Sequence, residues 1–159
     1  MNDKEKTEVI LNALIQYHTT WGRDRKNIIF PELRLGSGYS DIAMRRIDLF
    51  IISSDKGNLT TAFEIKVSRK DFLSDIKKPL KQRGARLYSN NFYYVTPKSL
   101  LTVDEIPLWA GLMEYDFEQK EKYLSFFQKV PAPLQNKANP SWGLIASLIR
   151  KIKSMEVKG

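Results

Sequence analysis

Two neighbouring segments rich in β-branched and apolar residues constrain this 159-residue chain more than any other feature. They span Arg46 to Ser53 and Thr60 to Val67, and the turn-forming residues Asp55-Lys56-Gly57-Asn58 lie between them. Extended runs that flank a short turn containing glycine predict a β-hairpin. We therefore expect two antiparallel strands at the centre of the fold.

Helical patterns flank this hairpin on both sides. Apolar residues recur every three to four positions over residues 4–21, from residue 71 onward, and again near the C-terminus, which predicts amphipathic helices. Pro79 should kink or restart the second helix, because proline lacks a backbone donor and clashes with the preceding turn. Asn139-Pro140 should cap and begin the last helix, with Trp142 on its apolar side.

Further extended patterns predict strands over residues 28–35, 91–96, 110–115 and 122–129. Pro31 suggests that the first of these lies at a sheet edge or contains a bend, where a missing backbone donor is tolerated. The hairpin requires antiparallel pairing, whereas the helical crossover that follows it requires parallel pairing. The sequence therefore predicts an α/β fold, with helices flanking a mixed central sheet, in a single domain over residues 1–159.

The composition narrows the function. Lysine and arginine number 26 against 18 acidic residues, and the net charge of +8 favours a polyanionic partner, nucleic acid before an anionic membrane surface. The alternative is that this charge only keeps the protein in solution. The sequence has no cysteine, which excludes thiolate zinc sites and cysteine nucleophiles, and no apolar run of about 20 residues that could span a membrane. Because the N-terminus also lacks a secretory signal, we expect a cytoplasmic protein without a membrane partner.

The predicted hairpin brings three charged residues together. A turn centred on Lys56 and Gly57 makes paired residue numbers sum to about 112 to 114, which places Asp48 opposite residues 64–66. Side chains alternate along a strand, so Glu64 and Lys66 share one face with Asp48. One interpretation is an ordinary cross-strand ion pair, which would stabilise the fold by less than about 1 kcal/mol. The other is that the two carboxylates bind a hard divalent cation such as Mg²⁺ beside the lysine.

Asp48 followed by Glu64-x-Lys66 resembles the signature of the PD-(D/E)xK nuclease superfamily. The segment from Phe63 to Asp75 is similar to small bacterial and phage nuclease-like proteins, and the resemblance spans roughly residues 28–96. It implies a restriction-endonuclease-like core of αβββαβ type and hydrolysis of DNA phosphodiesters that depends on Mg²⁺ or Mn²⁺. One departure is Ile47, which stands where the family usually has proline, a position that does no chemistry.

The resemblance also implies roles for individual residues. Asp48 and Glu64 would be catalytic metal ligands, the backbone carbonyl of Ile65 a further ligand, and Lys66 the catalytic lysine. Many members add an upstream carboxylate. Glu32 is the first candidate for it and Glu8 the second, the alternative for each being a solvated acid.

Basic residues near the motif suggest where a substrate would lie. In related nucleases the helix after the motif contacts the scissile strand, so Lys81, Gln82 and Arg83 are candidate phosphate-binding residues. Arg46, which enters the strand of Asp48, is another candidate. The alternative for the helix is a solvated amphipathic face, and for Arg46 a residue that only fixes the strand edge.

These patterns leave three functions open. The first is a metal-dependent DNA nuclease, in repair, restriction or mobile-element biology. The second is a non-catalytic nucleic-acid-binding module on the same fold. The third is a basic interaction protein whose acids and lysine form only ion pairs. Small nucleases of this kind often dimerise to cut both strands, so a homodimer is one candidate assembly.

Overall fold

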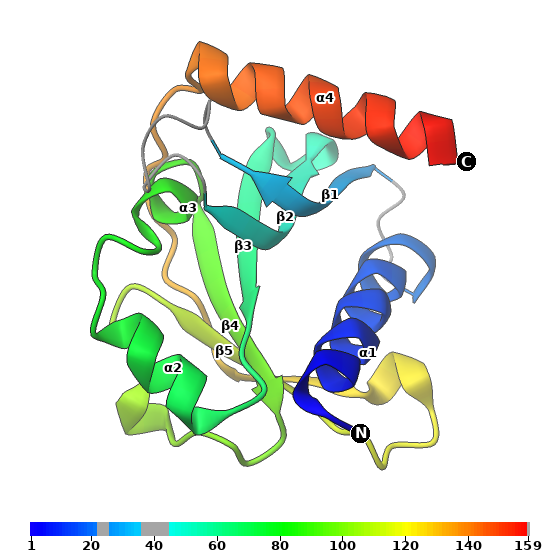
Figure 1. Ribbon diagram of the computed structural model, residues 1–159, viewed down its shortest axis with the longest axis vertical. Coiled ribbons are helices and arrows are strands. Elements are labelled where there is room, and N and C mark those ends of the chain that lie inside the picture. The colour runs from blue at the N-terminus through cyan, green and yellow to red at the C-terminus, as the bar shows by residue number, and fades with distance from the viewer. Residues whose placement is uncertain (22–25, 36–44, 159) are drawn as a thin grey trace.

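The computed structural model describes residues 1–21, 26–35 and 45–158, and in it the predicted hairpin lies within a six-stranded mixed sheet (Figure 1). The strands are β1 (Asn27–Arg34), β2 (Arg46–Ser53), β3 (Leu59–Ile65), β4 (Asn91–Pro97), β5 (Gly111–Tyr115) and β6 (Phe126–Val130). Their spatial order follows the chain, so β1 is an edge strand, which is one of the two alternatives that Pro31 suggests. Strand β4 runs parallel to β3 and β5, and the other neighbours are antiparallel. The predicted mixed sheet is confirmed.

Helices cover both faces of this sheet (Figure 1). They are α1 (Asp3–Gln16), which continues as a π-helical turn over Tyr17–Trp21, then α2 (Arg69–Ile76), α3 (Arg83–Leu87) and α4 (Trp142–Lys158). Short 3-10 turns lie at Ser54–Lys56, Val103–Glu105 and Lys122–Leu124. The break between α2 and α3 contains Pro79, as predicted. Within the described part of the chain, no helix combines the length and apolar character needed to cross a bilayer.

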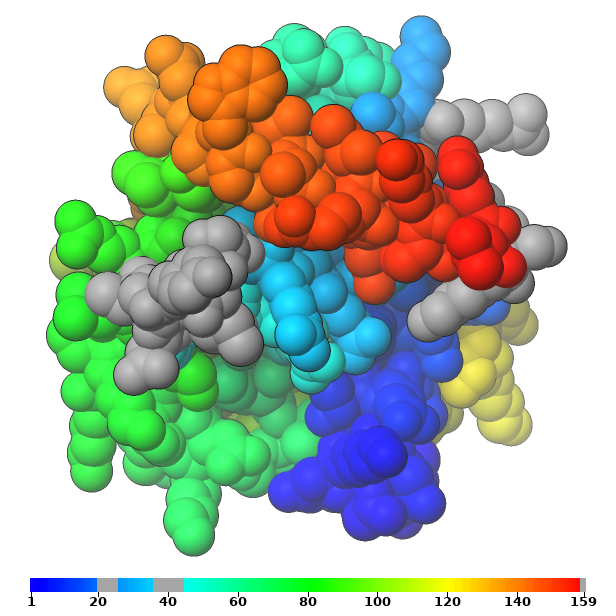
Figure 2. Space-filling model, turned by 45° about the horizontal axis from the view of Figure 1, so that its top comes forward, coloured from blue at the N-terminus to red at the C-terminus, as the bar shows by residue number. Residues whose placement is uncertain are grey.

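The two faces of the sheet bury separate apolar clusters. Helix α1 packs Ile10 and Leu14 against Phe63 and its neighbours on one face. On the other face, Phe50 belongs to a cluster shared with α2, α3 and Leu144 of α4. Helix α4 lies across β1 at the edge of the molecule (Figure 2). The sheet therefore separates an α1 side from a side formed by the other three helices.

Three predictions near the C-terminus are wrong in detail. The last helix begins at Trp142 and is capped by Ser141, whose side-chain oxygen accepts a hydrogen bond from the Leu144 amide at 3.1 Å, so Asn139-Pro140 precedes the cap. Trp142 is 84% exposed, because the helix turns Leu144 inward instead. The last strand begins at Phe126 and not at residue 122, since residues 122–124 form a 3-10 turn.

The edge strand contains an irregularity opposite the motif aspartate. Glu32 has a φ of 52°, in the left-handed region, between the pairs Pro31↔Leu49 and Leu33↔Ile47. This register places Glu32 opposite Asp48.

The side-chain alternation shifts at this irregularity in both strands. On β1, Phe30 and Leu33 are three residues apart and belong to the same apolar cluster. On β2, Ile47 and Phe50 are also three residues apart and belong to that cluster. Ile47 and Leu49 therefore belong to apolar clusters on opposite faces of the sheet, although regular alternation along β2 would place them on the same face. A shift of this kind re-aims side chains next to it, as β-bulges do.

Candidate active site

The two motif carboxylates occupy adjacent strands, as predicted. Strands β2 and β3 pair with residue numbers that sum to 112, through Leu49↔Phe63, so Asp48 faces Glu64 one step further along. The Oδ2 atom of Asp48 accepts a hydrogen bond from the backbone amide of Ile65 at 2.8 Å. This bond fixes the Asp48 carboxylate against β3, where the backbone ladder between the two strands ends.

For both carboxylates, the nearby hydrogen-bond donors and positive charges do not offset the cost of burial. Burial raises the pKa of Asp48, although the Ile65 amide and the Lys66 charge oppose the shift. Burial, and then repulsion from Asp48, raise the pKa of Glu64 to about 8. The Glu64 side chain is 10% exposed, so solvent screens little of this repulsion. The pair therefore gains from any additional positive charge that binds beside it.

Lys66 lies between Glu64 and a second acid from α2. Its Nζ atom is 3.1 Å from Glu64 Oε1 and 3.3 Å from Asp75 Oδ1, and its side chain is 9% exposed. Burial alone would lower the pKa of Lys66, but the charges of Glu64 and Asp75 hold this pKa above its ordinary value. Lys66 is therefore a fixed ammonium at the centre of the site.

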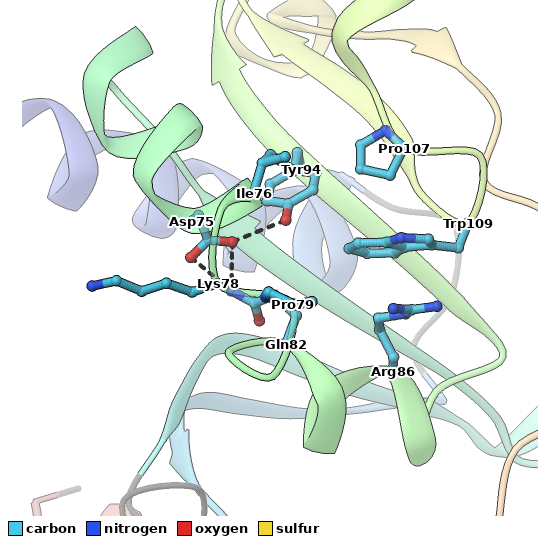
Figure 3. A pocket seen from close by; sticks show the side chains of 9 residues that line it. All are labelled: Asp75, Ile76, Lys78, Pro79, Gln82, Arg86, Tyr94, Pro107 and Trp109. Atoms are coloured by element: carbon cyan, nitrogen blue, oxygen red, sulfur yellow. Dashed lines mark hydrogen bonds between the residues drawn. The ribbon is translucent and has the colours of Figure 1, made fainter.

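Asp75 is the residue that the sequence prediction missed. Its side chain is fully buried, and besides Lys66 it accepts hydrogen bonds from Lys81 Nζ at 2.8 Å, Gln82 Nε2 at 3.0 Å and the Tyr94 hydroxyl at 2.9 Å. Figure 3 shows the bonds from Gln82 and Tyr94 meeting at this carboxylate. Burial would raise the pKa of Asp75, but these donors outweigh it and hold the pKa below its ordinary value.

A sequence signal for Asp75 does exist. Asp75 follows the buried Phe72 by three residues on α2, so it occupies the apolar face of that helix. An acid at such a position requires partners, because burying an unpaired carboxylate is costly.

The predicted substrate-binding residues divide into two groups. Lys81 and Gln82 turn inward to Asp75, and Gln82 is buried. Arg83 is exposed, and Arg46 is half-exposed and lies 3.5 Å from Glu32. The structure therefore joins Lys81 and Gln82 to the acidic site and leaves Arg83 and Arg46 at the surface.

The two candidates for an additional carboxylate lie in different places relative to the site. Glu32 lies opposite Asp48 in the register, and its charge is close enough to raise the pKa of Asp48. Glu8 is exposed on α1, which packs against the other face of the sheet. Of the two, Glu32 is the one that adjoins the site.

The donor set fits a hard cation held by few protein ligands. Within the described residues, no group of three or more histidine, cysteine or acidic side chains is arranged to hold a metal ion. Asp48 and Glu64, with the backbone carbonyl of Ile65, are the groups that could bind one. Mg²⁺ commonly takes only one or two carboxylates and completes its shell with water and substrate oxygens.

Comparison with known proteins bears on the fold alone. No protein-family profile matches the chain, and no curated protein is similar to it. Its structure is similar to that of a protein of unknown function from Silicibacter pomeroyi, with a TM-score of 0.54 and 18% sequence identity. The similarity covers 84% of this chain and 77% of that one. It supports the α/β architecture described above.

Proposed function

We propose that this protein is a metal-dependent DNA nuclease of the PD-(D/E)xK kind. The observation that carries the proposal is the pair Asp48 and Glu64, a partly buried and a buried acid that repel one another beside Lys66, an ammonium that Glu64 shares with Asp75. Such an arrangement is costly for an apo protein, and a bound divalent cation relieves it. The order of elements from α1 to β4 also matches the αβββαβ core that the sequence resemblance implies.

The residues of the site would act on a phosphodiester in distinct ways. Asp48, Glu64 and the Ile65 carbonyl would hold Mg²⁺ or Mn²⁺, which supplies an activated water and neutralises phosphate charge when bound. Lys66 is held as an ammonium by Glu64 and Asp75, so it stabilises developing negative charge and does not accept a proton. Glu32, opposite Asp48, is the candidate for a further ligand.

Exposed cations near the site favour a nucleic-acid substrate. Lys77, Lys78 and Arg83 are exposed on or between α2 and α3, the helices that follow the motif. The net charge of +8 adds a general attraction for a polyanion. Contacts of this kind position a phosphate backbone without reading its sequence.

Cleavage by an Asp48→Asn variant tests the proposal. Plasmid, branched and single-stranded DNA are incubated with the purified protein and Mg²⁺, Mn²⁺ or a chelator. We expect the parent to cut only with metal, and Asp48→Asn to lose at least about 100-fold in rate, since even indirect metal partners often contribute 10- to 100-fold. Asp55→Asn, in the exposed turn of the same hairpin, is the matched control and should cut like the parent. Equal cutting by Asp48→Asn and the parent contradicts the proposal.

One observation favours a second candidate, a non-catalytic nucleic-acid-binding module. The described residues contain no cluster of three metal-ligating side chains, so the cation site rests on two carboxylates. This alternative predicts salt-sensitive DNA binding that is the same with Mg²⁺ and with a chelator, and no cleavage of any substrate. Calorimetric titration with Mn²⁺ separates the two, because only the nuclease requires metal binding that Asp48→Asn removes.

A further inference from the structure

A small pocket has Asp75 in its wall, and Lys66 does not line it. Its volume is about 160 Å³, and it is formed by the segment from α2 to α3, by Tyr94 of β4 and by the loop before β5. Figure 3 shows Asp75, Ile76 and Tyr94 on one side of this pocket and Trp109 with Arg86 on the other. The pocket is therefore a direct neighbour of the acidic site, with which it shares the Asp75 carboxylate.

The walls of this pocket suit a flat ring. The Arg86 guanidinium stacks on the Trp109 indole at 3.9 Å from the ring centroid, and the Tyr94 and Trp109 rings are 6.0 Å apart. Ile76, Pro79 and Pro107 supply further apolar surface. Binding sites for planar ligands combine such surfaces with a few polar groups.

One polar group in the wall lacks a partner. The Nε atom of Arg86 is buried and makes no hydrogen bond, although a buried donor without an acceptor costs free energy. Two other polar groups of the wall are engaged, since Gln82 and Tyr94 donate to Asp75. A ligand that enters the pocket and carries an acceptor could satisfy Arg86.

We propose that this pocket receives one pyrimidine base of an unpaired nucleotide in the DNA substrate. A cavity of about 150 Å³ accommodates one benzene molecule, so 160 Å³ has room for a single six-membered ring, and a purine would extend out of the pocket. The carbonyl oxygens of a pyrimidine are acceptors for Arg86, and Lys78, whose exposed side chain extends away from the pocket, can meet the attached phosphate. This inference rests on the proposed nuclease function and defines its substrate further.

The pocket excludes a base that remains paired. A base reaches such a pocket only after it leaves its stack and its partner, which is least costly in single-stranded or distorted DNA. The shared Asp75 carboxylate places the bound base next to the site that holds Lys66. The enzyme would therefore cut beside an unpaired pyrimidine in preference to continuous duplex.

Binding of short oligonucleotides with a chelator present tests the pocket apart from cleavage. The probes are an octamer of thymidylate, the same octamer with abasic sites, and an octamer of deoxyadenylate, all at one salt concentration. Ile76→Trp fills the pocket from α2, and Leu73→Trp is the matched control, because Leu73 is similarly exposed on that helix and does not line the pocket. Thermal unfolding confirms that both variants are folded.

We expect the parent to bind the thymidylate octamer about tenfold more tightly than the other two probes, as one stacked base contributes. Ile76→Trp should lose this preference, and Leu73→Trp should keep it. Thymidine should also quench tryptophan fluorescence in the parent but not in Trp109→Phe. Equal binding of thymidylate and abasic octamers by the parent, or an unchanged preference in Ile76→Trp, overturns the inference.

The nuclease and the pocket can fail separately. Cleavage of the same octamers with Mg²⁺ reports on Asp48 and Glu64, whereas binding with a chelator reports on the pocket. Thymidylate preference without cleavage would support the pocket and contradict the nuclease. Cleavage by the parent without a base preference would support the nuclease and contradict the pocket.

Discussion

Lys66 separates two buried acidic regions whose charges are balanced in different ways. On one side, Asp75 accepts hydrogen bonds from Lys81, Gln82 and Tyr94 as well as an ion pair from Lys66. On the other side, Asp48 and Glu64 are close enough to repel one another, and Lys66 is the buried cation between them and Asp75. The pKa of Asp75 is accordingly held below its ordinary value, whereas the pKa of Glu64 rises to about 8.

This difference favours a structural role for Asp75 and agrees with the functional role proposed for Asp48 and Glu64. A carboxylate with four donors needs nothing further, and it fixes α2, Lys66 and β4 relative to each other. Two acids with too few donors lower the stability of the metal-free protein, and perturbed carboxylates of this kind are concentrated at functional sites. The contrast predicts opposite responses when each side loses its charge.

The largest effect is expected from Asp75→Asn. The substitution leaves Lys66 and Lys81 without their shared buried partner, and breaking a buried ion pair typically costs 3 to 5 kcal/mol, so we expect the free energy of unfolding to fall by about that amount. Urea denaturation measures the change. Asp71→Asn, exposed on the same helix, is the control and should cost below about 1 kcal/mol. A loss for Asp75→Asn no larger than the control would contradict the assignment of Asp75 as the structural acid.

Acid titration of the protein also reports on His18, so the contribution of His18 to stability has to be measured separately from that of the acids. Burial, with the charge of Lys56, lowers the pKa of His18 to about 4 on the α1 face of the sheet, where its ring packs 5.2 Å from that of Phe63. The unfolded chain binds this proton near pH 6.5, so the stability that neutral His18 provides is lost as the pH falls from 6.5 to about 4.

We expect that loss to reach roughly 3 kcal/mol, from about 1.4 kcal/mol for each unit of pKa shift. The measurement is the difference in unfolding free energy between the parent and His18→Gln from pH 7.5 to pH 4. The difference isolates His18, because Asp75 and Glu64 titrate in both proteins. A difference that does not change with pH would show that His18 is not held neutral by the fold.

The local parts of this picture could be predicted from the sequence. The hairpin register depends on its turn, which is why a predicted sum of about 112 to 114 placed Asp48 close to Glu64, and the observed sum is 112. The mixed sheet followed from the same reasoning, because a short turn and a helical crossover permit one strand direction each.

The parts that depend on packing between distant segments could not be predicted. The partners of Asp75 come from β4, from the position after β3 and from the break between α2 and α3, and no local pattern joins them. Trp142 fits the apolar pattern of the last helix, yet α4 rests on β1 through Leu144 and leaves Trp142 exposed. The shift at Glu32 was missed because a left-handed glutamate in a strand has no sequence signature.

Glu64→Gln should have a small effect of the opposite sign to Asp75→Asn. The amide removes the repulsion between Glu64 and Asp48, and Lys66 keeps Asp75 as its partner. We expect the metal-free protein to gain up to about 1 kcal/mol in unfolding free energy, and cleavage to be lost. Urea denaturation in the presence of a chelator measures the gain. A destabilisation as large as that of Asp75→Asn would show that the two acidic regions are alike.

The smallest effect concerns the backbone at Glu32. A non-glycine residue at a φ of 52° stores about 1 kcal/mol of strain, and glycine adopts this conformation freely. Glu32→Gly and Glu32→Ala both remove the carboxylate and its contact with Arg46, so the difference between them reports the backbone alone. We expect Glu32→Gly to be more stable than Glu32→Ala by up to about 1 kcal/mol, and both to lose cleavage equally if Glu32 binds the metal. Equal stability of the two variants would mean that the strain is absent, and full cleavage by both would leave Asp48 and Glu64 as the side-chain ligands.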